Sequence, residues 1–261
     1  MTAEPYRFAG RTAVVTGGAG GIGRAVCAGL LAEGATVAVV ELAGVDLAVE
    51  QLRATATATG QVQGWTVDVR DPVAVTMLIR NVHDRLGGPH LLVNLAGGSL
   101  GTPRELDAIA PADLDLVLDV NVKGTFLCCQ AAMPYLIEAG GGAIVNTSSI
   151  GGRQPSPVTG VPYAAAKAAI VGLTKRLAKE VGPRGVRVNA VAPGLVLTDR
   201  LQGVFDAMDP AEQREVLDAI PLRRMPELAE IVEPILFLAS AAAGYITGVV
   251  LDVNGGRFMP L

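Results

Sequence analysis

Two residues in the second half of the chain could carry out acid–base chemistry. Tyr163 and Lys167 occur in Tyr-Ala-Ala-Ala-Lys, and a helix through them would place both side chains on one face. An ammonium group next to a phenol favours the phenolate and lowers the pKa of the phenol from about 10. Such a phenol can donate and accept a proton near neutral pH. The alternative is a core aromatic residue with a lysine on a solvated helix face.

A glycine-rich turn lies far upstream, in the sequence Thr-Gly-Gly-Ala-Gly-Gly-Ile-Gly of residues 16–23. It follows a β-branched run and opens a helical pattern, where backbone N–H groups and the helix dipole can hold a pyrophosphate. Its spacing, G-x-x-x-G-x-G, departs from the dinucleotide fingerprint G-x-G-x-x-G, and the turn alone is a weak signal. With the tyrosine and lysine it indicates a nucleotide-dependent redox enzyme. The turn residues expected to contact the cofactor are Gly17, Gly20, Gly21, Ile22 and Gly23.

Glu41 ends a predicted strand eighteen residues after Gly23. A carboxylate there can accept hydrogen bonds from the adenosine ribose and repel a 2′-phosphate, so NAD is predicted rather than NADP. Gly20 and Leu42 place no cation inside the turn or directly after Glu41. The alternative is a surface acid at a strand end.

Asp68 could accept a hydrogen bond from the adenine amino group, or it could initiate the turn that follows it.

Short β-branched runs alternate with helical patterns along the chain. The predicted strands are Thr12–Thr16, Thr36–Val40, Val62–Val67, Leu91–Asn94, Ala143–Thr147, Val186–Val191 and Val249–Val253. The predicted helices are Ile22–Glu33, Asp46–Thr57, Pro72–Leu86, a long pair over Pro111–Ala139, Val161–Val181 and Glu227–Ala239. Alternation of this kind predicts right-handed crossovers and a parallel sheet covered on both faces. We expect one α/β domain over residues 1–261, with a doubly wound, Rossmann-like sheet of seven parallel strands.

Composition excludes several classes of protein. The formal charge of −4 and the pI near 5.3, with mixed signs along the chain, give no basic footprint for nucleic acid or an anionic membrane. The N-terminus has no export signal, and no uncharged apolar stretch is long enough to span a bilayer. Three cysteines within apolar helical patterns indicate buried reduced thiols and a cytoplasmic protein. His83 and His90 share no metal-ligand spacing, so no metal site is expected.

The chain resembles the classical short-chain dehydrogenases/reductases over essentially its whole length. The motifs that carry the resemblance, in family order, are Thr-Gly-x-x-x-Gly-Ile-Gly, Asp68-Val69, Asn94-Leu95-Ala96-Gly97, Asn121, Ser149, Tyr163-x-x-x-Lys167, Pro193-Gly194, Thr198, Tyr245-Ile246-Thr247-Gly248 and Asn254-Gly255-Gly256. A chance match of this ordered set is not credible, although its single members are weak signals.

The resemblance implies a catalytic role for four residues. Tyr163 would donate a proton to the carbonyl oxygen in reduction or take it from the alcohol in oxidation, and Ser149 would polarise that oxygen. Lys167 would lower the pKa of Tyr163 and bind the nicotinamide ribose, while Asn121, in a kinked helix, would anchor a water between Lys167 and solvent. Ser149 and Asn121 could instead be ordinary polar residues. Beyond the glycine turn, the expected cofactor contacts are Glu41, Leu42, Asp68, Val69, Asn94, Ala96, Gly97, Tyr163, Lys167, Pro193, Gly194, Val196 and Thr198.

The sequence departs from the family pattern at two places. Leu95 replaces the second asparagine of Asn-Asn-Ala-Gly, which removes a polar tie to neighbouring strands. Tyr163 lies fourteen positions after Ser149, one more than in the family, so the segment 154–157 is expected to bulge over the substrate. Ser148 therefore remains a rival to Ser149.

The expected function is NAD-dependent interconversion of a small to medium secondary alcohol and its ketone. The rival is a 3-oxoacyl-thioester reductase, which usually uses NADP and a basic docking surface, whereas residues 133–147 contain no Lys or Arg. A binding protein without turnover would have lost part of the Ser, Tyr and Lys set. Residues 98–107, 153–162 and 195–224 are expected to be variable loops around the substrate. We also expect a homotetramer, because the helices within 114–139 and 161–181 should have apolar outward faces and the chain end 249–261 is apolar. In that assembly, the tail 255–258 would lie near a two-fold axis.

Overall fold

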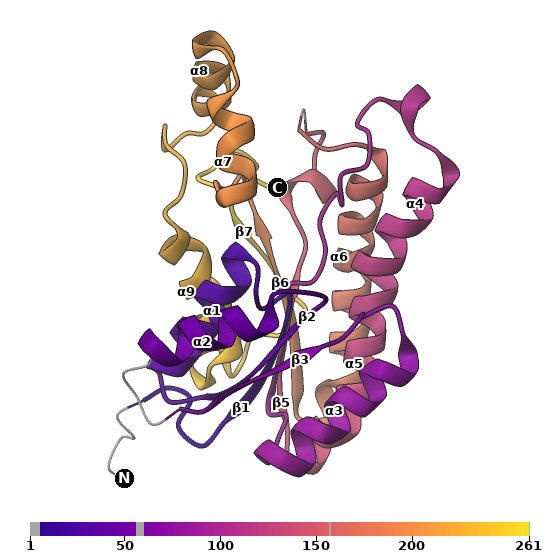
Figure 1. The fold of residues 1–261 in the computed structure, drawn as a ribbon, viewed down its shortest axis with the longest axis vertical. Helices are drawn as coiled ribbons and strands as arrows, with labels where there is room; N and C mark the ends of the chain where they lie inside the picture. Colours follow the sequence, from indigo (N-terminus) through magenta and orange to yellow (C-terminus); the bar gives the residue numbers. More distant parts are fainter. Residues whose placement is uncertain (1–5, 56–59, 157, 261) are drawn as a thin grey trace.

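A single twisted sheet forms the centre of the protein (Figure 1). The structure is a computed structural model that describes residues 6–55, 60–156 and 158–260. Seven strands, all parallel, lie in the order β3-β2-β1-β4-β5-β6-β7. They are β1 (Thr12–Thr16), β2 (Thr36–Glu41), β3 (Val62–Thr66), β4 (Leu91–Asn94), β5 (Gly142–Thr147), β6 (Val186–Pro193) and β7 (Val250–Val253). The predicted doubly wound, Rossmann-like sheet is confirmed.

Helices cover both faces of the sheet because neighbouring residues of each buried strand point to opposite sides. Ala13 and Val15 of β1 pack into one hydrophobic core, whereas Val14 packs into the other. The first core is covered by α1 (Gly21–Ala32), α2 (Val45–Thr55) and α9 (Leu228–Ala239). The second is covered by α3 (Pro72–Leu86), α5 (Gly124–Glu138) and α6 (Val161–Val181). Strand order reverses between β1 and β4, which is where open α/β sheets form their ligand crevice.

Most predicted elements are present, with boundaries that move by one or two residues. The strands Thr12–Thr16 and Leu91–Asn94 and the helices Pro72–Leu86 and Val161–Val181 begin and end where predicted. The predicted end of the second helix, residues 56 and 57, lies outside the described residues.

The segment 195–224 is not simply a loop, and this part of the prediction is wrong. It forms α7 (Asp199–Asp206) and α8 (Pro210–Asp218), which project beyond the sheet beside the C-terminal end of the chain (Figure 1). Helix α8 begins with a capping box, in which Asp209 Oδ1 accepts from the Glu212 amide at 2.8 Å and Glu212 Oε2 accepts from the Asp209 amide at 3.1 Å. No residue of α8 is buried. The helix therefore has little of the apolar periodicity on which the sequence prediction relied.

One long helical unit connects β4 to β5. It consists of α4 (Pro111–Leu118), a π-helical turn over Asp119–Lys123 and α5, and residues 111–138 are long and apolar enough to cross a membrane by composition alone. In the structure, however, Cys128, Ala132 and Leu136 of this unit are buried against the sheet with Leu92 and Ile144. The unit is thus a core helix of the fold.

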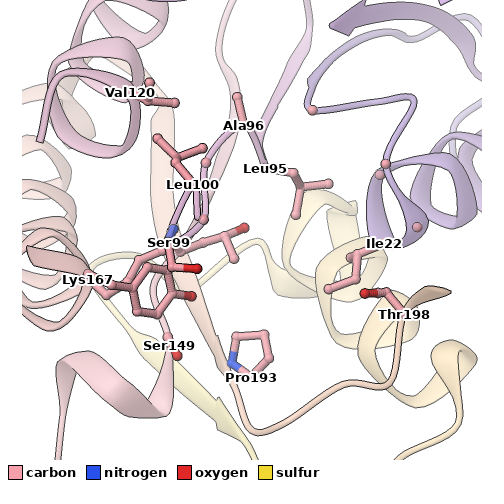
Figure 2. A pocket seen from close by; sticks show the side chains of 18 of the residues that line it. Ile22, Leu95, Ala96, Ser99, Leu100, Val120, Ser149, Lys167, Pro193 and Thr198 are labelled. Atoms are coloured by element: carbon pink, nitrogen blue, oxygen red, sulfur yellow. The ribbon is translucent and has the colours of Figure 1, made fainter. Parts of the chain in front are cut away.

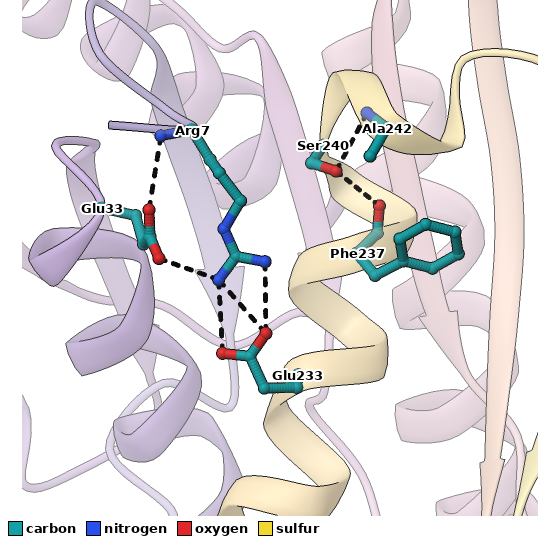
Figure 3. A network of polar contacts seen from close by, with 6 residues as sticks. All are labelled: Arg7, Glu33, Glu233, Phe237, Ser240 and Ala242. Atoms are coloured by element: carbon teal, nitrogen blue, oxygen red, sulfur yellow. Dashed lines mark hydrogen bonds and ion pairs between the residues drawn. The ribbon is translucent and has the colours of Figure 1, made fainter. Parts of the chain in front are cut away.

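The N-terminal segment is attached to the first helical layer through Arg7 (Figure 3). Its guanidinium pairs with Glu33 at 2.9 Å and with Glu233 of α9 at 3.2 Å, and the pairing lowers the pKa of the Glu33 carboxyl. At the end of α9, the Ser240 hydroxyl donates to the Phe237 carbonyl at 2.8 Å and accepts from the Ala242 amide at 3.2 Å. Arg7 thus links the N-terminal segment to both α1 and α9, and Ser240 closes the end of α9.

The three cysteines are buried free thiols, as the sequence predicts. Cys27 lies in α1, while Cys128 and Cys129 lie in α5 on the other face of the sheet. Burial raises the pKa of all three thiols, that of Cys128 to about 12. They are therefore protonated and shielded at neutral pH.

Candidate active site

The glycine turn lies between β1 and α1 and has no room for side chains at two of its positions. Gly17 has φ +71°, and a Cβ there would lie 2.7 Å from the Ala96 nitrogen. A Cβ on Gly23 would collide with the Gly17 carbonyl. Gly20 is the N-cap of α1, and the Arg24 amide donates to its carbonyl at 2.7 Å. The amides that precede Arg24 in the helix are thus available to an anionic group.

A cleft of about 760 Å³ runs from this turn to the Tyr163 side chain. Figure 2 shows Ile22 and Thr198 on one side of it and Ser149 and Lys167 on the other. Of the sequence-predicted residues, those lining the cleft are Gly17, Gly20, Gly21, Ile22, Gly23, Glu41, Leu42, Asp68, Val69, Ala96, Gly97, Ser149, Tyr163, Lys167, Pro193, Gly194, Val196 and Thr198. Asn94 and Asn121 do not line it.

Asn94 lies inside the sheet. Its Nδ2 donates to Asn146 Oδ1 at 2.9 Å across the β4 and β5 pair, and Asn146 Nδ2 donates to Thr174 Oγ1 of α6 at 3.0 Å. Asn94 therefore provides a polar link between β4 and β5, although the second asparagine of the family motif is replaced by Leu95 in this chain. Leu95 keeps its backbone link to Thr16 at 3.1 Å and packs against the first core.

Asn121 is buried in the π-helical turn and holds the loop after β4. Its Oδ1 accepts from the Gly98 amide at 3.0 Å, and its Nδ2 donates to the Gly98 carbonyl at 3.0 Å and the Val117 carbonyl at 2.9 Å. A Cβ on Gly97 would collide with Asn121 Oδ1. The helix is distorted at the residue where a kink was expected, and the amide fixes Gly97 and Gly98 along the cleft.

Tyr163 and Lys167 project from one face of α6. The Lys167 ammonium lies 5.5 Å from the centre of the Tyr163 ring and donates to the Thr147 carbonyl at 2.9 Å. Lys167 is 5% exposed, and burial lowers its pKa to about 8. The amine is thus held between the end of β5 and the phenol.

The two adjacent serines occupy different environments. Ser148 is buried, and its hydroxyl donates to the Lys167 carbonyl at 2.8 Å. Ser149 caps the short turn after β5, where its Oγ accepts from the Gly151 amide at 3.1 Å. Because an accepted hydrogen bond leaves the hydroxyl proton of Ser149 available, it remains able to donate to a substrate oxygen. Ser156, Val158 and Thr159 of the longer segment before α6 also line the cleft, while Pro157 lies outside the described residues.

Asp68 takes part in the turn that the sequence offered as its alternative role. Its Oδ1 accepts from the Arg70 amide at 2.9 Å, and its Oδ2 accepts from the Arg70 guanidinium at 2.6 Å. The guanidinium holds the pKa of this carboxyl below its usual range. Asp68 still lines the cleft, together with Arg70.

Sequence reasoning missed cations near the cleft. Arg24, in the first turn of α1, lines a smaller hollow with Gly20, Glu41 and Leu42, and its guanidinium donates to Gln51 Oε1 at 2.7 Å. Helical spacing from Gly20 could have placed Arg24 there. Arg257 lines the main cleft from the C-terminal tail, and no pattern in the sequence indicates this.

Comparison with known proteins identifies the family. The family model described as enoyl-(acyl carrier protein) reductase matches residues 17–257. A 3-oxoacyl-[acyl-carrier-protein] reductase of Staphylococcus aureus is 37% identical over 253 residues, covering 95% of this chain and 98% of the relative. This chain belongs to the classical short-chain dehydrogenase/reductase family. It is therefore an oxidoreductase for small molecules with a nicotinamide cofactor.

Other members of this short-chain dehydrogenase/reductase family match as fully, and not all of them are named for the same substrate. A 3alpha-hydroxysteroid dehydrogenase of Mediterraneibacter gnavus is 38% identical over 247 residues, covering 94% of this chain and 96% of the relative. A 3-oxoacyl-[acyl-carrier protein] reductase of Brucella melitensis, solved with bound NAD, superposes with a TM-score of 0.84 at 35% identity, covering 97% of this chain and 95% of that one. The family thus fixes the reaction type and leaves the substrate open.

Proposed function

We propose that this protein is an NAD-dependent dehydrogenase or reductase that interconverts a secondary alcohol and its ketone, with Tyr163 as acid and base. The observation that carries the proposal is the buried Lys167 ammonium 5.5 Å from the Tyr163 ring, in a cleft that continues to the glycine turn. A cation at that distance stabilises the phenolate and leaves Tyr163 able to exchange a proton with a substrate oxygen.

Ser149 and Asn121 support this exchange in different ways. Ser149 lines the cleft and would donate a hydrogen bond to the carbonyl oxygen as negative charge develops on it. Ser148 is the weaker candidate because its hydroxyl already donates to the Lys167 carbonyl at 2.8 Å. Asn121 would act through the loop of Gly97 and Gly98, which it holds by paired hydrogen bonds of 3.0 Å. We assign it a positioning role.

The cleft fits a nicotinamide dinucleotide. Gly17 and Gly23 let the turn pack closely on itself and on Ala96, because a Cβ at either position would collide with backbone atoms. The turn thereby places the free amides at the start of α1 beside the cleft, where they could hold a pyrophosphate. Glu41 and Asp68 would lie at the adenosine end, and Pro193, Gly194 and Thr198 would line the nicotinamide side. The bound cofactor supplies or accepts the hydride, and the protein orients it against the substrate carbon.

We propose NAD rather than NADP because Glu41 lines both the main cleft and the adjoining hollow, where a ribose 2′-phosphate would meet a carboxylate. Arg24 in the same hollow is the group that could offset this repulsion.

We also propose a cytoplasmic location, which the buried reduced thiols support. The assignment of residues 1–261 as one domain stays a proposal.

The experiment that tests the chemistry is Tyr163→Phe. Removal of the phenolic proton should lower turnover by several orders of magnitude in an NAD-coupled absorbance assay over a panel of secondary alcohols. NADH binding, followed by fluorescence titration, should stay within about threefold of the wild type because the ring is kept. Retained turnover in the variant would contradict the assignment of Tyr163.

A second candidate is reduction of 3-oxoacyl thioesters, which the name of the 37% identical Staphylococcus aureus relative supports. It predicts rapid oxidation of NADPH or NADH with acetoacetyl thioesters and slow turnover of simple ketones. Parallel assays with a free ketone and an acyl thioester, each with both cofactors, separate the two functions.

A further inference from the structure

The C-terminal tail brings a positive charge into the substrate half of the cleft. Arg257 is partly buried and lines the cleft together with Ser149, Ser156 and Tyr163. Within the described residues, its guanidinium forms no ion pair with a carboxylate. A guanidinium that has lost part of its hydration and has no counter-charge is a binding group for an anion.

The backbone that carries Arg257 is folded into a fixed turn. Asn254 Oδ1 accepts from the amides of Gly256 at 3.1 Å and Phe258 at 3.2 Å, and the Arg257 amide donates to the Asn254 carbonyl at 3.2 Å. Gly255 and Gly256 adopt φ values of +64° and +86°, which side-chain-bearing residues rarely take. The turn fixes the point from which the arginine extends.

A second arginine fastens this tail to the segment that follows Ser149. The Arg153 guanidinium lies 5.0 Å from the centre of the Phe258 ring and pairs with Asp252 of β7 at 2.9 Å. Gln154 Nε2 donates to the Arg257 carbonyl at 3.5 Å. Asp252 therefore compensates Arg153, which leaves the charge of Arg257 for a ligand.

The two other cations among the described lining residues, Arg70 and Lys167, already have polar partners. Arg70 is paired with Asp68 at 2.6 Å, and the Lys167 ammonium donates to the Thr147 carbonyl at 2.9 Å. The lining next to Ser149 and before Tyr163 consists of apolar and hydroxyl residues, namely Ile150, Ser156, Val158 and Thr159. Among the described lining residues of this half, no acidic side chain accompanies Arg257.

We propose that the substrate carries a carboxylate in addition to its hydroxyl or keto group, and that Arg257 binds this carboxylate. The inference rests on the proposed function and adds a substrate class to it. A planar guanidinium can donate two parallel hydrogen bonds to a carboxylate, which fixes the orientation of the molecule as well as its affinity. Arg257 thereby selects hydroxy or keto acids over neutral alcohols and ketones of the same size.

The test compares acids with their own methyl esters. The wild type, Arg257→Gln, Arg257→Lys and the control Arg80→Gln are assayed with NAD and a panel of aliphatic hydroxy acids, each paired with its methyl ester. Arg80 is an exposed residue of α3 outside the cleft, so its variant removes the same charge without touching the site. All variants are checked for unchanged melting temperature.

We expect the wild type to prefer at least one acid over its ester. Arg257→Gln should lower kcat/KM for that acid by about 30-fold or more, mainly through KM, while the ester changes by less than about threefold. Arg257→Lys should recover part of the loss, because it restores the charge but not the planar pair of donors. Preference for every ester in the wild type, or equal losses for acid and ester in Arg257→Gln, would overturn the proposal.

A binding measurement separates this inference from the proposed function. If the wild type turns over neither the acids and esters nor any member of the panel of secondary alcohols, the proposed activity is contradicted. The role of Arg257 in binding a carboxylate is then tested by the rise in melting temperature that the acids produce in the presence of NADH. A rise present in the wild type and lost in Arg257→Gln supports the carboxylate site, and no difference between the two proteins overturns it.

Discussion

At the scale of single residues, Lys167 is a cation kept where water hardly reaches it. Burial lowers its pKa to about 8 from an unfolded value near 10.5. The folded state therefore disfavours the protonated amine, and this penalty is fully present below pH 8. It is relieved as the pH rises from about 8 towards 10.5, because the folded protein then loses its proton while the unfolded chain still binds one.

Stability should consequently rise with pH in this window relative to a variant without the amine. Between pH 8 and 9, the free energy of unfolding of the wild type should gain about 1 kcal/mol over that of Lys167→Met. Urea unfolding of both proteins at pH 7, 8 and 9 and at one protein concentration measures the difference. Groups that titrate in both proteins cancel, so a constant or falling difference would show that the pKa of Lys167 is not lowered.

Cofactor selectivity is a second property decided by single residues. Wild type should show at least about a hundredfold higher kcat/KM with NAD than with NADP, because in the proposed binding mode a ribose 2′-phosphate would meet the Glu41 carboxylate. The double variant Glu41→Ala with Leu42→Arg should narrow that ratio by tenfold or more, as a carboxylate is lost and a cation gained. Leu42→Arg alone, which keeps the carboxylate, is the control and should change the ratio less. A wild type that prefers NADP would show that Arg24 outweighs Glu41.

From the sequence, the chemical roles of single residues could be predicted better than the contacts that those residues make. The Tyr and Lys spacing places both side chains on one helix face, and the structure brings them to the cleft. Asn94 could not be assigned from its motif, since only the β4 and β5 register reveals that its amide is used by Asn146 at 2.9 Å. Arg257 lies ninety residues beyond Lys167, and its place depends on how the chain end folds back.

At the scale of elements, the π-helical turn over Asp119–Lys123 carries Asn121, which holds the loop of Gly97 and Gly98 beside the main cleft. Asn121→Ala should lower the free energy of unfolding by about 2–3 kcal/mol, because it removes the hydrogen bonds of the buried amide to the partly buried Gly98 backbone and to the Val117 carbonyl. It should also weaken NADH binding through the loop. Chemical denaturation and fluorescence titration measure the two effects, and an unchanged unfolding midpoint would contradict the role of the amide.

Element prediction succeeded where burial dictates a pattern. Strands β1 and β4 are buried on both faces and consist of largely apolar runs, and α3 and α6 have an apolar stripe, so the limits of these elements could be predicted. Helices α7 and α8 were missed because the side chains that the structure describes in them are partly or fully exposed. The π-helical turn was anticipated only as a kink, since one extra residue in a helix leaves little trace in apolar spacing.

At the scale of the whole molecule, the second helical layer exposes several large apolar side chains on its outer surface. Leu114, Phe126 and Val161 are exposed on α4, α5 and α6, with Phe126 48% accessible. Light scattering at micromolar concentration should give about four times the 26.8 kDa chain mass, because pairing of these faces about two-fold axes would bury them. Phe126→Glu should shift the mass towards dimer or monomer. A wild-type monomer would contradict the predicted homotetramer.

The placement of the three thiols has a consequence for how opening of this fold can be observed. Cys27 reports on the layer of α1, and Cys128 and Cys129 report on the layer of α5, so the two sides of the sheet carry separate native probes. A thiol reagent can reach each probe only when the covering helix detaches, since all three are buried and protonated. The relative labelling rates therefore rank the opening free energies of the two layers without any added label or mutation.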